Sequence, residues 1–344
     1  MRAHAPETQT LYAQLFEATA AQELELVGSF RNGLAIERDV RGKPYHYWQM
    51  RDVTGRLRQV YLGPAHDEGA RLLREALRAR KDPPILADLE RITAAYVASG
   101  GARHQGAHFS VVDALARAGL FRAGAVLVGS HAFVSIGAAL GVTWSAATIA
   151  TTDVDLCRDS FVTVACDVLE PLHLPGVLEA IDPTFFLVPA FDLKSPHTSM
   201  KSRSVKVDLL TTSRHPRDTK PRDIGPFGIA AQPLRYMDYL VREDVQRGLF
   251  IGPRALLINM PHAGRFALHK LAVATRRAGG DGNIKAGKDR LQAAALIEVL
   301  AKEQPGALTH AARAAKAHHD KGLVRDMRAS LARLPEPTRH QVKL

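Results

Sequence analysis

The sequence lacks the long apolar run that a membrane-spanning helix needs. No stretch of its 344 residues approaches the roughly 20 consecutive apolar side chains that cross a bilayer. The first residues hold no apolar segment of the kind found in a secretory signal, so we expect none. These two absences predict a protein of the cytoplasm with no membrane partner.

Cysteine is also scarce, since Cys157 and Cys166 are the only two in the chain. Neither has the spacing of a metal-binding motif, and two scattered thiols suit a reducing compartment. We expect both to be buried structural thiols.

Acidic residues are too few to balance the basic ones. The chain has 35 Asp and Glu against 46 Lys and Arg, which gives a formal net charge of +11. A basic surface concentrates polyanions and favours nucleotides or nucleic acids as partners, although charge alone does not say where the basic residues lie. The hydrophobic share of 46% is that of an ordinary globular protein, and the length allows two or three domains.

Hydrophobic periodicity divides the chain into three regions, residues 1–100, 101–262 and 263–344. The first region has helical spacing near its start and then an alternating, glycine-punctuated stretch over about 27–63, which predicts a small antiparallel sheet. Basic residues alternate with aromatic ones in that stretch, as around Tyr45. Such a sheet either binds nucleic acid or packs on the main domain.

The other two regions predict an α+β domain followed by helices. The fold class is therefore α+β: a mixed sheet flanked by helices, with an N-terminal helix, a small antiparallel β element and a C-terminal helical region. The last region predicts helices over about 264–277, 289–302 and 309–334, with a loop at 279–282.

Three features of the central region point to one chemistry. An apolar strand ends in Gly129-Ser130 and leads into a helix, Asp153 and Asp155 alternate on a second strand, and Asp208 lies on a third alternating stretch. Aspartates at i and i+2 of a strand point to one side, where a third carboxylate can join them. Carboxylates are the ligands that Mg²⁺ prefers. Two such ions can offset the charge that develops when a hydroxyl attacks the α-phosphorus of a nucleoside triphosphate.

The Gly-Ser turn suits the other end of a nucleotide. Gly129 has no side chain, so the backbone can approach phosphates closely, and the amides at the start of the next helix favour an anion. Each motif is weak by itself, because a lone strand-end aspartate is most often a solvated carboxylate. The ordered combination carries the prediction.

These residues resemble a known family. Leu127-Val128-Gly129-Ser130 followed by Asp153-Val154-Asp155-Leu156 resembles the hydrophobic-Gly-Ser and Asp-x-Asp motifs of the DNA polymerase beta-like nucleotidyltransferase superfamily. The resemblance implies that Gly129 and Ser130 contact a triphosphate, and that Asp153, Asp155 and Asp208 bind two Mg²⁺ ions, with Mn²⁺ as a substitute. It also implies that residues 101–262 form the catalytic domain.

A bacterial subgroup known as nucleotidyltransferase fold proteins is more similar still, over about residues 120–300. The stretches that carry this are Val128–Phe133, Leu140–Val142, Thr152–Asp155 and, for the third carboxylate, Val207–Thr211. The interval between Ser130 and Asp153 is longer than is usual in the superfamily, and we expect the extra residues around 144–150 to lie near the pocket.

Several basic residues are candidates for contact with the nucleotide. Similar toxin-type enzymes carry a helical lysine that faces the triphosphate, and Lys270 is in that place. Lys206 shares a strand face with Asp208, and Arg203 precedes it. A further basic cluster can bind phosphate or RNA, or can form a solvated face; it consists of Arg276, Arg277, Lys285, Lys288 and Arg290.

The sequence thus predicts a nucleotidyltransferase that uses a nucleoside triphosphate such as ATP. Its acceptor is an RNA end such as that of tRNA, or a protein hydroxyl, and the resemblance extends to toxins that have a cognate antitoxin. The alternative is a catalytically inactive nucleotide-sensing or nucleic-acid-binding module with the same fold. A metal-dependent glycosyltransferase also uses Asp-x-Asp, but no nucleotide-sugar domain pattern precedes Asp153.

Overall fold

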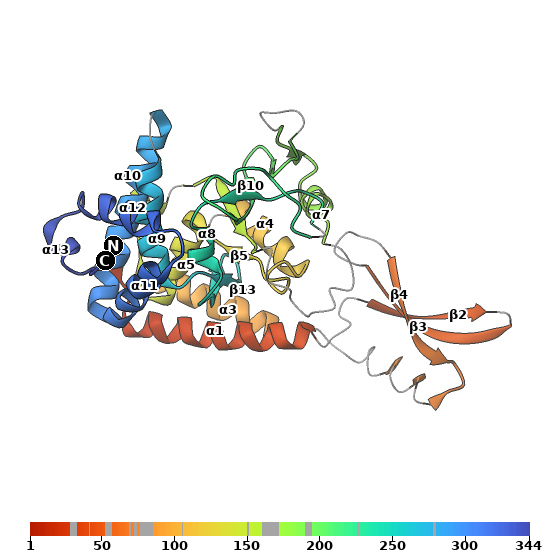
Figure 1. The fold of residues 1–344 in the computed structure, drawn as a ribbon. Coiled ribbons are helices and arrows are strands. Elements are labelled where there is room, and N and C mark those ends of the chain that lie inside the picture. The colour runs from red at the N-terminus through yellow and green to blue at the C-terminus, as the bar shows by residue number, and fades with distance from the viewer. Residues whose placement is uncertain are drawn as a thin grey trace.

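The chain is seen here as a computed structural model (Figure 1). It describes residues 1–27, 33–40, 42–51, 57–68, 70–71, 74–75, 85–104, 106–149, 151–159, 172–189, 195–225, 227–277 and 280–344. No helix within these ranges is both long enough and apolar enough to cross a bilayer. Cys157 is a buried free thiol, as expected, and Cys166 lies outside the described residues.

A mixed sheet forms the centre of the molecule, and its strand order explains how distant parts of the sequence meet. Strand β10 pairs in parallel with β7 and with β11, while β9 pairs with it antiparallel; β5 lies antiparallel to β7 at one side, and β8 to β9 at the other. The strands are β5 (Val126–Leu127), β7 (Asp153–Cys157), β8 (Phe186–Leu187), β9 (Ser199–Lys201), β10 (Lys206–Thr212) and β11 (Gln232–Leu234). The mixed α+β architecture agrees with the prediction.

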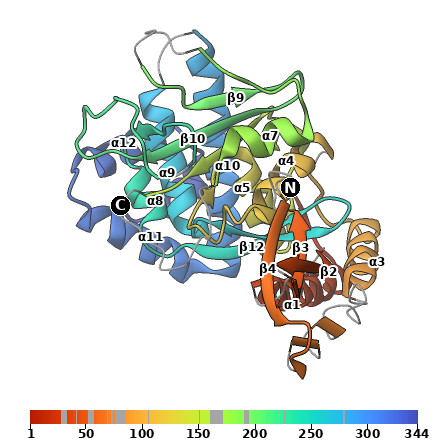
Figure 2. The same cartoon turned by 90° about the vertical axis from the view of Figure 1, so that its right-hand side faces the viewer.

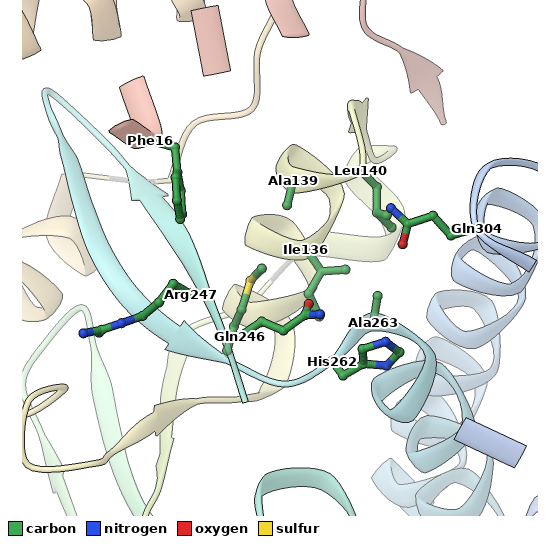
Figure 3. Close-up of a pocket in the computed structure, with 10 residues that line it drawn as sticks. Phe16, Ile136, Ala139, Leu140, Gln246, Arg247, His262, Ala263 and Gln304 are labelled. Carbon is green, nitrogen blue, oxygen red and sulfur yellow. The ribbon is translucent and has the colours of Figure 1, made fainter. Parts of the chain in front are cut away.

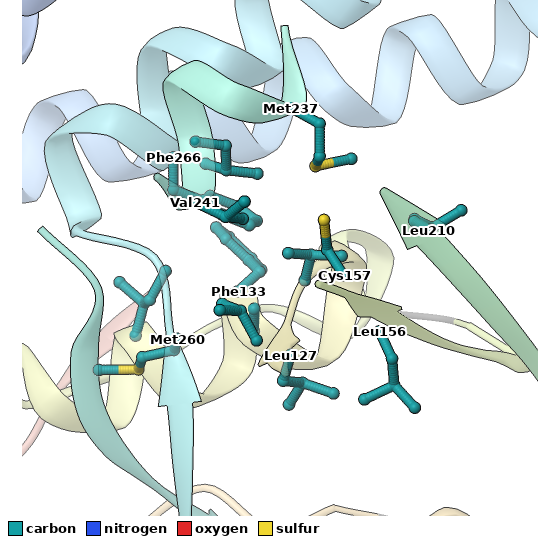
Figure 4. Packing of buried hydrophobic residues seen from close by; sticks show 14 of the residues in the cluster. Leu127, Phe133, Leu156, Cys157, Leu210, Met237, Val241, Met260 and Phe266 are labelled. Carbon is teal, nitrogen blue, oxygen red and sulfur yellow. The ribbon is translucent and has the colours of Figure 1, made fainter. Parts of the chain in front are cut away.

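Helices and a hairpin enclose the apolar face of this sheet. Leu127 and Leu156 on the strands share one buried cluster with Phe133 and Phe266 from two helices (Figure 4). The surrounding elements are α4 (Gly106–Arg117), α5 (Gly129–Ala139), β6 (Val142–Thr143), α6 (Ala146–Ile149), α7 (Leu174–Ile181), α8 (Met237–Val241), β12 (Gln246–Ile251) and β13 (Ala255–Met260). Burying this cluster supplies most of the apolar driving force for folding.

The N-terminal region contributes one long helix and a separate small sheet. Helix α1 (Pro6–Val27) packs against α3 (Ile85–Ala98) and β13, where Leu15 is fully buried. Strand β1 (Arg2–Ala3) pairs with β6. The small sheet has the order β2-β3-β4 and is antiparallel, as predicted; its strands are β2 (Gly33–Val40), β3 (Lys43–Arg51) and β4 (Leu57–Pro64). In Figures 1 and 2 it stands apart from the C-terminal helices.

The C-terminal region is helical, with two departures from the predicted boundaries. The expected helix over 309–334 is two helices, because the chain turns at residues 318–321. The expected loop at 279–282 is wrong from Gly280 onward, since α10 already begins there. The helices are α9 (Ala263–Arg276), α10 (Gly280–Glu303), α11 (Pro305–Ala317), α12 (Gly322–Leu331) and α13 (Glu336–Arg339). Helix α9 packs against both α10 and α12, and its Phe266 belongs to the buried cluster that covers the central sheet.

Candidate active site

Two neighbouring parallel strands bring the three predicted aspartates together. In the register of β7 and β10, Asp155 pairs with Asp208 and Asp153 pairs with Lys206. Residues in register on adjacent strands lie about 4.8 Å apart and share a face, and i and i+2 residues also share one. All four side chains therefore line the same face of the sheet, on which they are partly buried.

The Gly-Ser turn lies directly against Asp155. The backbone amide of Val128 donates to the carbonyl oxygen of Asp155 at 2.9 Å, so the end of β5 is fixed beside β7. Gly129 has a φ of +66°, and a Cβ there would be 2.0 Å from Asp155 Oδ2. Only glycine meets both demands. Helix α5 begins at this residue, which directs its first amides toward the same place.

The pKa of the Asp155 carboxyl reflects its burial and the charged groups around it. Burial raises the pKa of its carboxyl from 3.8 to about 6, and the negative charges of Asp208 and Asp153 add to the rise. Lys270 and Lys206 act in the opposite direction. A buried carboxylate that shares its site with like charges favours protonation or a bound cation.

Asp208 is held by two polar partners. Ser199 Oγ donates to Asp208 Oδ1 at 2.6 Å, and Lys206 Nζ lies 2.9 Å from Oδ2. Lys206 therefore neutralises the charge of this carboxylate, and its contact with a nucleotide remains a prediction. Ser199 was not singled out in the sequence, because it stands alone on β9 without a motif.

A second group of charges comes from the C-terminal helices. Lys270 Nζ on α9 donates to Asp289 Oδ1 at 2.8 Å, and Arg277 donates to Asp289 Oδ2 at 2.5 Å. The side chain of Asp289 is 2% exposed, so it is a buried carboxylate shared by two cations. The sequence gives little sign of it, because it stands in the basic run Lys288-Asp289-Arg290.

Lys288 connects α10 to the Gly-Ser turn. Its Nζ donates to Ser130 Oγ at 2.8 Å. Burial lowers the pKa of the Lys288 amine, and the nearby charge of Lys270 lowers it further, whereas Asp289 and Asp155 raise it. Within the described residues, the helices thus place a half-buried amine beside the first hydroxyl of α5, opposite the three carboxylates.

In the part of the chain that the structure describes, two other residues near the motifs, Arg203 and His131, make no hydrogen bond or ion pair with the three carboxylates. Arg203 is exposed in the turn between β9 and β10; hydrogen bonds from Thr184 lower the pKa of the Asp182 carboxyl, and the charge of Arg203 adds to that shift. Its contact with nucleotide remains a prediction. His131, next to Ser130, is buried, and its ring centroid lies 4.7 Å from that of His108 and 5.5 Å from that of Phe250.

The donor set fits a divalent cation. Three carboxylates lie on one face, and burial together with the charges of the other two raises the pKa of Asp155; they offer the hard oxygen ligands that Mg²⁺ prefers. Both oxygens of Asp208 already accept a hydrogen bond, and each keeps a lone pair that can ligate such an ion. The residues around 144–150, expected near the pocket, contribute Trp144, which packs under α5 with its Nε1 donating to the carbonyl oxygen of Phe133.

Another group has metal-like spacing among the described residues. The ligand atoms of Asp238, His318 and His319 all lie within 4.8 Å of one another. However, His318 Nδ1 accepts from the backbone amide of Asp320 at 3.1 Å, so its Nε2 carries the proton that it donates to Asp238 at 3.0 Å. We interpret this group as a hydrogen-bonded connection between α8 and the turn after α11.

One cavity is distinct from the carboxylate site. It has a volume of about 420 Å³ and is lined by Phe16, Leu140, Gln246 and His262, among others (Figure 3). It lies at the C-terminal end of α5, and Gly129 and Ser130 are at the other end of that helix, about 16 Å away. None of the predicted site residues lines it.

Comparison with known proteins supports the geometry. Residues 107–317, more than half of the chain, match a family model described as "Nucleotidyltransferase". This span includes the Gly-Ser turn, all three aspartates and the lysines of α9 and α10. No curated protein and no solved structure matches the chain. The match over most of the chain shows that the protein belongs to this nucleotidyltransferase family.

Proposed function

We propose that the protein transfers a nucleotide from a nucleoside triphosphate to an acceptor hydroxyl. One observation carries the proposal: Asp155 and Asp208 stand in register on adjacent parallel strands, and the Gly129 backbone lies against Asp155. This arrangement places a carboxylate cluster directly beside a turn that can bind phosphates. Nucleotidyl transfer requires these two features next to each other.

The carboxylates are the part that would hold two Mg²⁺ ions, or Mn²⁺ in their place. Asp153 and Asp155 from β7 and Asp208 from β10 would together supply the carboxylate ligands of these ions. The ions would offset charge on the attacking and leaving oxygens. Asp208 stands beside Ser199, on the side where β9 continues the sheet, and there it can accept the proton of the attacking hydroxyl.

The triphosphate would lie between the Gly-Ser turn and the helices. The first amides of α5 and the Ser130 hydroxyl can donate to phosphate oxygens, and Lys288 already reaches that hydroxyl. Lys270 is already paired with a counterion, because its Nζ lies 2.8 Å from Asp289 Oδ1. We propose that Lys288 and Lys270 both supply positive charge to the leaving pyrophosphate, with Lys270 held in position by Asp289.

The acceptor completes the proposal. The chain has a net charge of +11, which favours an RNA end, such as that of tRNA, over a small neutral molecule, and a protein hydroxyl is the second class. A toxin-type enzyme with a cognate antitoxin is the biological setting that the resemblance suggests. ATP is one of the four triphosphates to test.

The test is label transfer. The protein is incubated with Mg²⁺ and each α-labelled triphosphate, with total RNA, with its own polypeptide and with a protein extract as acceptors. We expect label transfer that is abolished by Asp155→Asn and by EDTA. The variant Asp88→Asn, which removes one exposed carboxylate of α3, should keep full activity. Triphosphate binding without transfer to any of these acceptors would instead favour the nucleotide-sensing module.

A further inference from the structure

The small sheet β2-β3-β4 has one covered face and one face, called the open face below, on which several described side chains are exposed. Ala35, His46 and Trp48 are 2–5% exposed and share the covered face. Ala70, which has a helical backbone, lies over this face, because a Cβ on Gly63, the residue paired with His46, would be 2.7 Å from the Cβ of Ala70. Side chains alternate along a strand, so the intervening residues must point to the opposite face.

The open face presents apolar, aromatic and basic side chains. On β2 it carries Leu34, which is 62% exposed, and Arg38, which is exposed. On β3 it carries Lys43, also exposed, and the half-buried Tyr45 and Tyr47. In the β2-β3 register Arg38 pairs with Tyr45, so a guanidinium stands next to an aromatic ring position.

The acidic residues of β2 occupy the covered side. Glu37 alternates with Arg38, and its carboxylate lies 3.5 Å from His46 Nδ1 on the covered face. Asp39 has the same parity and accepts from the Gly42 amide at 2.7 Å in the β2-β3 turn. Among the described side chains of β2 and β3, the open face therefore has positive charge and no carboxylate, which is complementary to a polyanion.

We propose that this open face binds single-stranded nucleic acid. Bases would stack on Tyr45 and Tyr47, and phosphates would contact Arg38 and Lys43. The strands are eight or nine residues long, so the face extends for about 26 Å, enough for several nucleotides. Stacking on aromatic rings combined with cationic contacts is the physical basis of sequence-tolerant single-strand binding.

The proposal deepens the proposed function, because it gives the class of the acceptor. It depends on that function only for the transfer step, since binding can be measured without it. The sheet stands apart from the C-terminal helices in Figure 1, so it can hold a strand whose end lies elsewhere on the protein.

The experiment measures binding of fluorescein-labelled 12-nucleotide oligouridine and oligothymidine to the full chain by anisotropy at several salt concentrations. We expect Arg38→Ala with Lys43→Ala to weaken binding and to reduce the slope of log K against log salt by about 1.4, which is two phosphate contacts on a single strand. The matched control, Arg91→Ala with Lys302→Ala, removes two exposed charges elsewhere and should leave the slope unchanged.

The tyrosines separate stacking from general charge attraction. Tyr45→Leu with Tyr47→Leu should weaken binding at least tenfold, whereas Tyr45→Phe with Tyr47→Phe should keep it within about twofold, because the rings remain. Binding of either oligonucleotide with this pattern supports the proposal. Equal losses in the charge control, unchanged binding in the leucine variant, equally tight binding of a duplex, or binding only to anionic lipid vesicles would overturn it.

A parallel measurement keeps this proposal separate from the transferase. Binding of Mg²⁺ and triphosphate should be the same in all these variants as in the parent protein. If oligonucleotide binding follows the pattern but no acceptor is ever labelled, the proposed function fails and the sheet proposal stands. If label transfer occurs but oligonucleotide binding ignores the sheet variants, the sheet proposal fails alone.

Discussion

Gly129 and Asp155 are packed so closely that no side chain fits between them. A Cβ on Gly129 would stand 2.0 Å from Asp155 Oδ2, and the φ of +66° is itself unfavourable for other residues. The turn that we propose binds phosphate and the carboxylate that we propose binds metal are thus fixed relative to each other by direct contact. A displacement of the Gly129 backbone must therefore also displace the Asp155 carboxylate.

Gly129→Ala is the sharpest test of that contact. We expect it to reduce label transfer by about 100-fold, because a shift of about 1 Å in Asp155 is enough for such a loss. The unfolding free energy should fall by about 2 kcal/mol from backbone strain. Gly106→Ala is the matched control, since a Cβ there meets nothing within 4 Å. Full activity in Gly129→Ala would contradict the close packing.

The buried charge of Asp155 should lower the unfolding free energy of the metal-free protein, relative to a protein with a neutral side chain at this position. The pKa of this carboxyl is about 6 in the folded protein and 3.8 as the ordinary value, so the folded state holds its proton longer. Stability therefore falls as pH rises from about 4 to 6, and the loss persists above pH 6. Asp155→Asn avoids it and should raise stability by about 2 kcal/mol at pH 7.5 without divalent cations.

Chemical denaturation at several pH values checks this prediction. The gain of Asp155→Asn should shrink as pH falls below 6 and vanish near pH 4. Excess Mg²⁺ with nucleotide should favour the parent protein instead, because ligand binding stabilises only the chain that binds it. A variant that is less stable than the parent at pH 7.5 would show that the charge is already compensated.

Lys288 offers a way to separate nucleotide binding from chemistry. If its amine contacts the triphosphate, Lys288→Ala should raise the KM for the triphosphate about tenfold or more, and Lys288→Arg should restore part of the loss. Lys285→Ala, which removes an exposed amine one turn away on α10, should behave as the parent protein. An unchanged KM in Lys288→Ala would remove this residue from the triphosphate site.

Asp289 should be essential for the fold around α9 and α10. Replacing it by Asn leaves the charges of Lys270 and Arg277 without their shared partner, and we expect a loss of about 3 kcal/mol in urea denaturation. Adding Lys270→Met to Asp289→Asn should recover a large part of the lost unfolding free energy, because the more buried of the two cations is then absent. Equal and additive losses would argue against this coupling.

Buried histidines should make the protein sensitive to acid. Burial lowers the pKa of His104 to about 4 and that of His269 to about 3, from 6.5, and lowers the pKa of His131 well below that value. The unfolded chain binds these protons first, so stability is lost as pH falls below about 6.5. The melting temperature should drop steeply between pH 6 and 4, and His269→Gln should make that drop shallower.

The sequence predicts which strands carry the site better than it predicts which charged side chains of the helices join it. Asp153, Asp155 and Asp208 stand on alternating stretches, and strand alternation is a local property that the chain displays openly. That β7 and β10 are adjacent and parallel is a tertiary fact, and only the family resemblance indicates it. Asp289 could not be predicted, because a carboxylate in a basic helical run looks solvated until two helices enclose it. Likewise, nothing local shows that Lys288 reaches Ser130 across 158 positions.

The order in which these groups leave the ribosome follows from their places along the chain. A nascent polypeptide that ends at Thr212 already carries Asp153, Asp155 and Asp208, but its parallel strands can pair only after the crossover of about fifty residues has closed. Lys270 and Lys288 are made later still. Until then the three acids lack the amines of α9 and α10, so the proposed site could bind a triphosphate only after α10 has been made.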